Sequence, residues 1–158
     1  MAMRRRRDMS QTPARLAYVN LFARDHAALA RFYQTVFGFA EIASHRSPIY
    51  ACLEAGGMEM GFNADSSYAL LGLSDRKPDG RAPMRTYVTI EVGTPESVDE
   101  AVAAAVQNGG RLVKAPYDTY YNARQAVLED PEGNVFRINH RKGPRLPADE
   151  VASPPWKA

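Results

Sequence analysis

The sequence predicts an α+β fold built from two paired βαβββ modules, and three observations lead to that prediction. A strand pattern followed by an amphipathic helix pattern occurs near the start of the chain and again near its middle. Three further strand patterns follow each helix pattern. Residues 75–83, a segment rich in charge, glycine and proline, separate the two halves and are typical of a linker.

The first module begins with a strand over residues 18–25, in which polar and apolar side chains alternate. Asp25 then caps a helix, because its carboxylate can accept from the free backbone N–H groups of the first turn. Gly38 ends the helix, since glycine adopts the left-handed conformation easily. The apolar stripe of the helix is Leu29, Phe32, Tyr33, Val36 and Phe37. The strands predicted after it are 40–44, 49–53 and 58–63.

The second module repeats this order from Tyr87. A strand over 87–92 alternates in the same way, Thr94 is the predicted helix cap, and Pro95 takes the first helical position, where its missing N–H costs nothing. The helical stripe is Val98, Ala101, Val102, Ala105 and Val106, and Gly109 and Gly110 end it. The strands predicted after it are 111–114, 124–129 and 134–139, the last two joined by a turn at 130–133.

The predicted divisions of the chain are a basic tail (1–13), modules at 14–74 and 84–142 on either side of the linker 75–83, and a proline-rich tail (143–158). The net charge of +2 comes from the run of arginines at 4–7. Such a run can hold nucleic acid, but no aromatic residues are interleaved with it, so we interpret it as a solvated tail and expect no nucleic-acid partner. Trp156 is a candidate to pin the C-terminal tail.

No apolar run approaches the roughly 20 residues that cross a bilayer, and no signal peptide is visible at the start of the sequence. We therefore expect a soluble, cytoplasmic protein without a membrane partner. The single cysteine, Cys52, excludes an internal disulfide and a thiolate-rich zinc site, and we interpret it as a buried structural thiol.

The alternation also predicts which side chains share a face. Apolar residues such as Leu21, Ile90 and Ile138 can pack under the helices, so their neighbours along each strand point the other way. If the sheet curves with the helices outside, those neighbours line a cup. The residues predicted to lie in the cup are Tyr18, Asn20, Glu59, Tyr87, Thr89, Glu91, Arg137 and Asn139.

Over roughly residues 14–141, the chain resembles the vicinal-oxygen-chelate superfamily of glyoxalases, bleomycin-resistance proteins and dioxygenases. The resemblance rests on Asp25 followed by the helix segment 31–39 (RFYQTVFGF), on the two opening strands, and on 129–134 (EDPEGN) before the last strand. It implies two modules forming a cup, a frequent homodimer, and metal-dependent lyase, isomerase, epoxide-opening or dioxygenase chemistry. Other members of the superfamily only sequester a drug.

The resemblance further implies where a metal would be held. Carried across residue by residue, the ligand positions fall on Tyr18, Glu59, Tyr87 and Arg137. Only Glu59 is an ordinary ligand, and a permanently charged arginine repels a cation. We therefore predict no metal at these positions and no cofactor. The three histidines, His26, His45 and His140, are interpreted as surface or edge residues.

Two interpretations of Arg137 stay open. It could form an ion pair with Glu59 that satisfies two buried charges and does nothing else. Alternatively, Arg137 holds an anionic or carbonyl oxygen of a ligand, Tyr18 and Tyr87 donate hydrogen bonds to that ligand, and Glu59 moves a proton.

Three tyrosines lie in residues 115–122, which we predict to connect two strands. They could form a pocket wall, because each combines an apolar ring with a polar tip, or they could pack at an interface. We favour the pocket wall, since the corresponding loop in the superfamily borders the cup. The residues concerned are Tyr117, Tyr120 and Tyr121.

Three functions follow from these residues. The first is a metal-free protein that binds a small anionic, carbonyl or aromatic molecule. The second is a metal-independent enzyme of the lyase, isomerase or dioxygenase type, with Glu59 as base and Arg137 stabilising an oxyanion. The third is a metal-dependent enzyme of the same superfamily.

Overall fold

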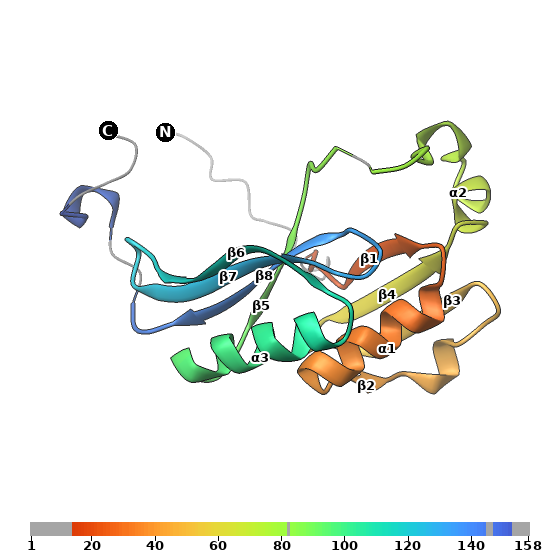
Figure 1. Cartoon of the computed structure of the whole chain (residues 1–158). Coiled ribbons are helices and arrows are strands. Elements are labelled where there is room, and N and C mark those ends of the chain that lie inside the picture. The colour runs from red at the N-terminus through yellow and green to blue at the C-terminus, as the bar shows by residue number, and fades with distance from the viewer. Residues whose placement is uncertain (1–13, 82, 145–146, 153–158) are drawn as a thin grey trace, which may run out of the picture.

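The computed structural model describes residues 14–81, 83–144 and 147–152 (Figure 1). The arginine run at 4–7 and Trp156 lie outside the described residues, so the expectations for them stay predictions. Within the described part, two βαβββ modules follow one another along the chain, as the sequence predicts.

The first module opens with β1 (Tyr18–Ala23) and α1 (His26–Phe37). Asp25 caps α1 by accepting a hydrogen bond from the N–H of Ala28 at 2.9 Å, and Gly38 ends it with a φ of 71°. The strands that follow are β2 (Ala40–Glu41), β3 (Tyr50–Glu54) and β4 (Glu59–Ala64), with a 3-10 turn, η1 (Ala43–His45), between the first two.

The second module has the same order. It comprises β5 (Val88–Glu91), α3 (Pro95–Gln107), β6 (Arg111–Asp118), β7 (Ala123–Glu129) and β8 (Val135–Arg141). Thr94 caps α3 by accepting from the N–H of Ser97 at 3.0 Å. Between the modules lie α2 (Ser67–Leu70) and η2 (Ser74–Arg76), and η3 (Ala148–Glu150) follows β8.

Each module contains one four-stranded mixed sheet, in the orders β1-β4-β3-β2 and β5-β8-β7-β6. The first strand of each module pairs in parallel with the last, and the remaining pairs are antiparallel. The helix between the first and second strand of each module packs on one face of its sheet. The α+β class is therefore confirmed.

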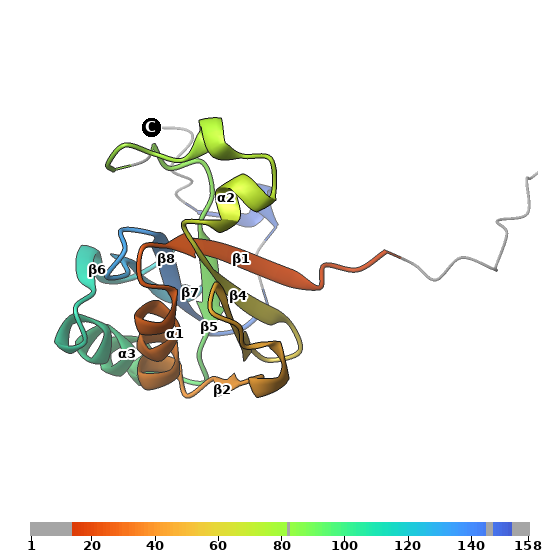
Figure 2. The same cartoon turned by 90° about the vertical axis from the view of Figure 1, so that its right-hand side faces the viewer.

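One hydrophobic core spans both modules. Figures 1 and 2 show α1 and α3 on the same side of the sheets, and residues of both helices and of β3, β4, β7 and β8 belong to a single buried cluster. The ring of Phe136 on β8 lies against three rings of α1, those of Phe32, Tyr33 and Phe37. Because α1 belongs to the first module and β8 to the second, the modules share a core.

The structure corrects the predicted strands most in two places, and other strand ends shift by one or two residues. The end of the expected strand 40–44 instead belongs to η1 (Ala43–His45), so β2 is reduced to two residues. The expected strand 111–114 continues to Asp118. Its register with β7 shifts between Leu112 and Lys114 and again between Lys114 and Tyr117, where Pro116 cannot donate a ladder hydrogen bond. The predicted connecting loop 115–122 is therefore confined to 119–122.

Within the described residues, no helix has the length and apolar character that crossing a membrane requires.

Candidate functional site

The predicted site residues lie on the sheet face away from the helices. Met60 and Phe62 of β4, and Phe136 and Ile138 of β8, are buried in the core beneath α1 and α3. Their neighbours along each strand, among them Glu59 and Arg137, therefore point to the opposite face. The strand alternation read from the sequence is thus what the structure shows.

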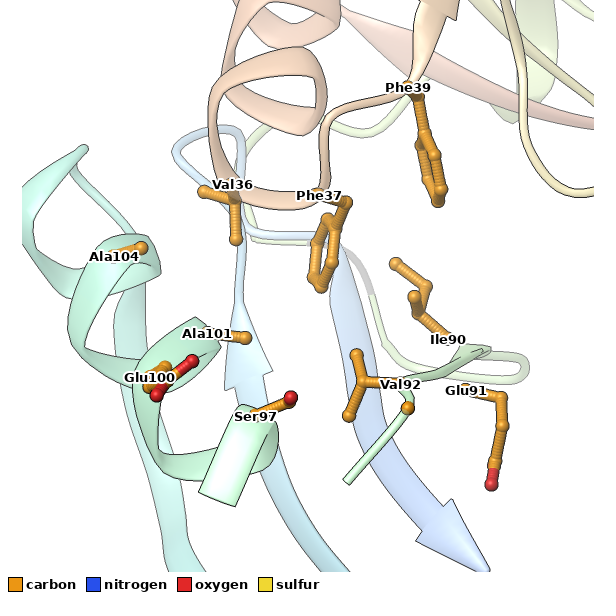
Figure 3. Close-up of a pocket in the computed structure, with 11 residues that line it drawn as sticks. Val36, Phe37, Phe39, Ile90, Glu91, Val92, Ser97, Glu100, Ala101 and Ala104 are labelled. Atoms are coloured by element: carbon orange, nitrogen blue, oxygen red, sulfur yellow. The ribbon is translucent and has the colours of Figure 1, made fainter. Parts of the chain in front are cut away.

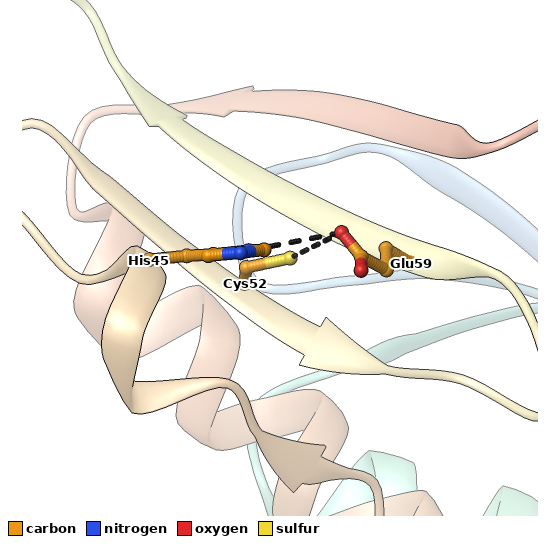
Figure 4. Close-up of side chains that lie close together, drawn as sticks. All are labelled: His45, Cys52 and Glu59. Carbon is orange, nitrogen blue, oxygen red and sulfur yellow. Dashed lines mark hydrogen bonds and ion pairs between the residues drawn. The ribbon is translucent and has the colours of Figure 1, made fainter.

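Glu59 lies at the centre of a first group of polar side chains. One of its carboxylate oxygens lies 3.7 Å from Nδ1 of His45 and 3.7 Å from Sγ of Cys52 (Figure 4). Tyr18 pairs with Glu59 in the parallel register of β1 and β4. A hydrogen bond to the Glu59 carboxylate, together with its negative charge, raises the pKa of the Tyr18 hydroxyl. We call Tyr18, His45, Cys52 and Glu59 the Glu59 group.

Cys52 is fully buried but is not part of the apolar cluster beneath the helices. Its neighbours Ala51 and Leu53 point into the core, so its thiol points to the polar face, where Gly61 lies opposite. Burial raises the pKa of the Cys52 thiol, and the charge of Glu59 adds to this. The thiol therefore stays protonated at neutral pH and is a poor nucleophile. The expectation of a buried thiol is confirmed.

Arg137 lies at the centre of a second group. Its Nε donates to Oγ1 of Thr89 at 3.1 Å, and its Nη1 donates to the hydroxyl of Tyr121 at 3.2 Å. Its guanidinium carbon lies 5.3 Å from the ring centroid of Tyr87, within the range of a cation–π contact. We call Thr89, Tyr87, Tyr121 and Arg137 the Arg137 group.

The tyrosines of β6 and of the loop after it extend the Arg137 group. Gln125 of β7 joins two of them: it accepts from the hydroxyl of Tyr121 and donates to that of Tyr117. Nζ of Lys114 lies 3.7 Å from the ring centroid of Tyr117, and the ring of Tyr120 contacts that of Tyr121 edge-on. Burial raises the pKa of Tyr121, while Arg137 opposes the shift.

The remaining predicted residues form smaller pairs. Asn139 donates to Glu91 at 2.6 Å, and the other carboxylate oxygen of Glu91 accepts from the backbone N–H of Arg141 at 2.6 Å. The side-chain oxygen of Asn139 is buried without a hydrogen-bond partner among the described atoms. Asn20 accepts from the amide of Asn63 at 3.3 Å, on the same face as the Glu59 group.

The two groups draw their contacts from different modules. The hydrogen-bond and ion-pair partners of Glu59 come from the first module, and those of Arg137 come from the second. In the part of the chain that the structure describes, no hydrogen bond or ion pair joins Glu59 to Arg137. The interpretation of Arg137 as the ion-pair partner of Glu59 is therefore wrong within the single chain. Arg137 forms an ion pair with no other described carboxylate either.

The four positions that hold a metal in the superfamily do not fit a cation here. Two of these positions, Tyr18 and Glu59, come from the first module, and the other two, Tyr87 and Arg137, come from the second. A fixed guanidinium charge at one of the positions repels the ion, and neutral phenols are weak ligands.

The histidines differ in their surroundings. His26 opens α1, and Nδ1 of His140 lies 2.9 Å from the backbone oxygen of Val92. His45 instead belongs to the Glu59 group, which the sequence pattern does not predict. No sequence signal gives this contact, because η1 replaces the end of a predicted strand and turns His45 back over β3.

A separate hollow lies on the helix side of the second sheet. Its volume is about 460 Å³, and its walls come from the end of α1, from β5 and from α3 (Figure 3). Phe37, Phe39, Ile90 and Val92 give it an apolar floor, and Glu91 lies at its edge. It lies away from the Arg137 group, because Ile90 points to the helix face of β5.

The paired βαβββ modules and their polar face define a class of small two-module proteins. Sequence comparison assigns the chain to a superfamily. The glyoxalase/bleomycin resistance protein/dioxygenase superfamily matches residues 15–138, and the chain belongs to that superfamily. No match is found among curated proteins.

Solved structures share the fold. A glyoxalase/bleomycin resistance protein/dioxygenase family enzyme from Burkholderia phytofirmans PsJN is 48% identical with a TM-score of 0.76, over 81% of this chain and 99% of that one. A glyoxalase-related enzyme from Fulvimarina pelagi is 21% identical with a TM-score of 0.69, over 88% and 95% of the two chains. Lactoylglutathione lyase from Agrobacterium tumefaciens is 16% identical with a TM-score of 0.61, over 84% and 97%. The last two likenesses concern the fold alone.

Proposed function

We propose that this protein binds a small aromatic molecule carrying a carboxylate or carbonyl oxygen, and that Arg137 binds this oxygen without a metal. The observation that carries the proposal is the state of Arg137: it is half-buried, held by Thr89 and Tyr121, and forms no ion pair with any described carboxylate. A half-buried charge without an ion-pair partner favours an anionic ligand, because hydrogen bonds between ionised groups are the strongest a side chain makes.

The surroundings of Arg137 support an aromatic ligand. The ring of Tyr87 and the hydroxyl of Tyr121 lie beside the guanidinium, and Tyr117 is joined to Tyr121 through Gln125. Aromatic rings provide apolar contact area while their hydroxyls remain available for hydrogen bonds. The carboxylate of Glu91 already accepts hydrogen bonds from Asn139 and from the backbone, so its charge is in part satisfied. Arg137 therefore determines the sign of the charge that a ligand should carry.

Substitution of Arg137 tests the proposal, with benzoate and its neutral analogue benzamide as probes. We expect calorimetry to show that Arg137→Met weakens benzoate binding by about tenfold to a hundredfold, since a hydrogen bond to a charged group contributes about 1.5–3 kcal/mol. Benzamide should lose less. The matched control is Arg31→Met, which removes the same charge from the exposed side of α1. Benzoate binding that is equal in the Arg137 variant and the control contradicts the proposal.

A homodimer belongs to the same proposal. β1 and β5 are edge strands of their sheets, and Tyr18, on β1, and Tyr87, just before β5, are exposed in the single chain. An exposed edge strand with aromatic side chains is a surface that a second copy can cover. Sedimentation at micromolar concentration should give twice the 17.5 kDa mass of the chain, and a monomer would contradict this part of the proposal.

The catalytic alternative assigns proton transfer to Glu59. The contacts of its carboxylate with Tyr18 and His45 favour this alternative, because a base needs neighbours that orient it. On this hypothesis Glu59→Gln abolishes turnover of a carbonyl substrate while benzoate binding at Arg137 stays within about twofold of the wild type. Equal turnover in both proteins contradicts it.

A further inference from the structure

We propose that His45, Cys52 and Glu59 form a binding site for one divalent ion of the zinc class, held entirely within the first module. The site is distinct from the four positions of the superfamily, because His45 comes from η1 and Cys52 from β3. Only Glu59 is common to both sets. It does not depend on the Arg137 group, whose contacts come from the second module.

The geometry of the three side chains matches a tetrahedral ion. Zn–S bonds of about 2.3 Å and Zn–N or Zn–O bonds of about 2.1 Å place neighbouring ligand atoms about 3.5 Å apart. In the structure, Nδ1 of His45 and Sγ of Cys52 each lie 3.7 Å from Oε2 of Glu59. All three ligand atoms lie within 4.8 Å of one another (Figure 4). Small side-chain rotations would therefore bring them onto one ion.

The fold explains why these residues meet. Cys52 and Glu59 are on adjacent antiparallel strands, and alternation directs both away from the core. Gly61, opposite Cys52, has no side chain on this face; a Cβ there would collide with Asn20 and Tyr50. η1 then places His45 above β3, so that its ring faces the carboxylate. Sulfur, nitrogen and oxygen donors thus converge from three short segments.

The donor set indicates the class of ion. An ion that binds here displaces the thiol proton of Cys52. The resulting thiolate and an imidazole favour zinc and similar borderline ions, whereas calcium and magnesium prefer oxygen ligands alone. The side chains of His45 and Glu59 are 38% and 30% exposed, so the site opens to solvent on one side. Three protein ligands with an open fourth position are typical of sites at which the ion also contacts water or a ligand.

Titration of the metal-free protein with Co²⁺, followed by displacement with Zn²⁺, tests this site. Cobalt bound to a thiolate in a tetrahedral site gives a near-ultraviolet charge-transfer band and strong visible bands. We expect both to saturate at one ion per chain and to disappear when zinc is added. Removal of a residue that only hydrogen-bonds to a metal ligand lowers metal affinity about 10–100-fold, so His45→Ala, which removes a ligand itself, should lower it at least that much.

Matched variants distinguish this site from cobalt bound elsewhere on the chain. His26→Ala removes a histidine from the start of α1 and should leave the titration unchanged, whereas Cys52→Ser should abolish the charge-transfer band. Because His45 is on the surface, its variant should melt at the wild-type temperature in the presence of a chelator.

The proposal is overturned if the wild-type chain binds no cobalt stoichiometrically, or if His45→Ala and His26→Ala bind it equally. It is also overturned if Tyr87→Phe abolishes binding, because the ion would then lie at the superfamily position. None of these readouts depends on benzoate binding or turnover.

Discussion

Replacing Phe136 with alanine should destabilise the protein by about 3–5 kcal/mol, the cost of deleting a fully buried phenylalanine. The ring is 0% exposed and lies between 5.7 and 6.0 Å, centroid to centroid, from three aromatic rings of α1. The cavity would open where the second module meets the helix of the first. Urea denaturation followed by far-ultraviolet circular dichroism measures the loss.

Two control variants distinguish a core shared by both modules from a core confined to one module. Leu70→Ala removes an apolar side chain that is 73% exposed on α2, and it should change the free energy of unfolding by no more than about 0.5 kcal/mol. Phe62→Ala removes a fully buried ring of β4 within the first module. If the modules share a core, Phe136→Ala and Phe62→Ala each unfold in a single cooperative transition of the whole chain. A loss below about 1 kcal/mol for Phe136→Ala would mean that the modules do not depend on this contact.

The order of helices and strands was predictable because local sequence patterns determine it. Asp25 caps α1 with its carboxylate, and Gly38 ends the helix in the left-handed conformation, as these residue types favour. The alternation in β4 and β8 is enforced by burial on one face, so it could be read without knowing the partners of either strand. Strand ends were less predictable. β6 extends to Asp118 because pairing with β7 outweighs the turn tendency of the residues after Lys114.

The candidate site was predictable only in part. The alternation along the strands placed Glu59 and Arg137 on the polar face, but the distance between them depends on how the modules dock. That docking comes from α1 packing on Phe136 and on the turn at 130–134, which are tertiary contacts without a local signal. His45 illustrates the same limit, since a 3-10 turn of three residues decides where its ring points.

The second large effect concerns a buried hydrogen bond between the modules. The Tyr33 hydroxyl of α1 donates to the Asp130 carboxylate at 2.9 Å, and both residues are buried. Asp130 also accepts from the backbone N–H groups of Glu132 and Asn134, at 2.9 and 3.0 Å, and thereby fixes the turn before β8. Tyr33→Phe removes one donor from a buried carboxylate, so we expect a loss of about 1.5–3 kcal/mol at pH 7.

The pH dependence of this loss identifies its cause. Burial raises the pKa of Asp130 above its ordinary value, while the hydrogen bond from Tyr33 opposes that shift. A carboxyl whose folded pKa is raised stabilises the fold fully at pH values below its unfolded pKa, and this contribution is lost as the pH rises through the folded pKa. Tyr33→Phe raises the folded pKa further. The variant should therefore lose more stability relative to the wild type at pH 7 than at acid pH, where Asp130 is protonated in both proteins.

Urea denaturation of both proteins at pH 7 and at about pH 3, below the ordinary aspartate pKa of about 3.9, measures the difference. Tyr87→Phe is the matched control. Tyr87, just before β5, is 48% exposed, so removing its hydroxyl should change the free energy of unfolding by no more than about 0.5 kcal/mol at either pH. In the Asp130→Asn background, Tyr33→Phe should cost less than it does alone, because the hydroxyl then has no charged acceptor. An equal cost at both pH values and in both backgrounds would show that the ring of Tyr33 packs on the core but that its hydrogen bond does not hold the modules together.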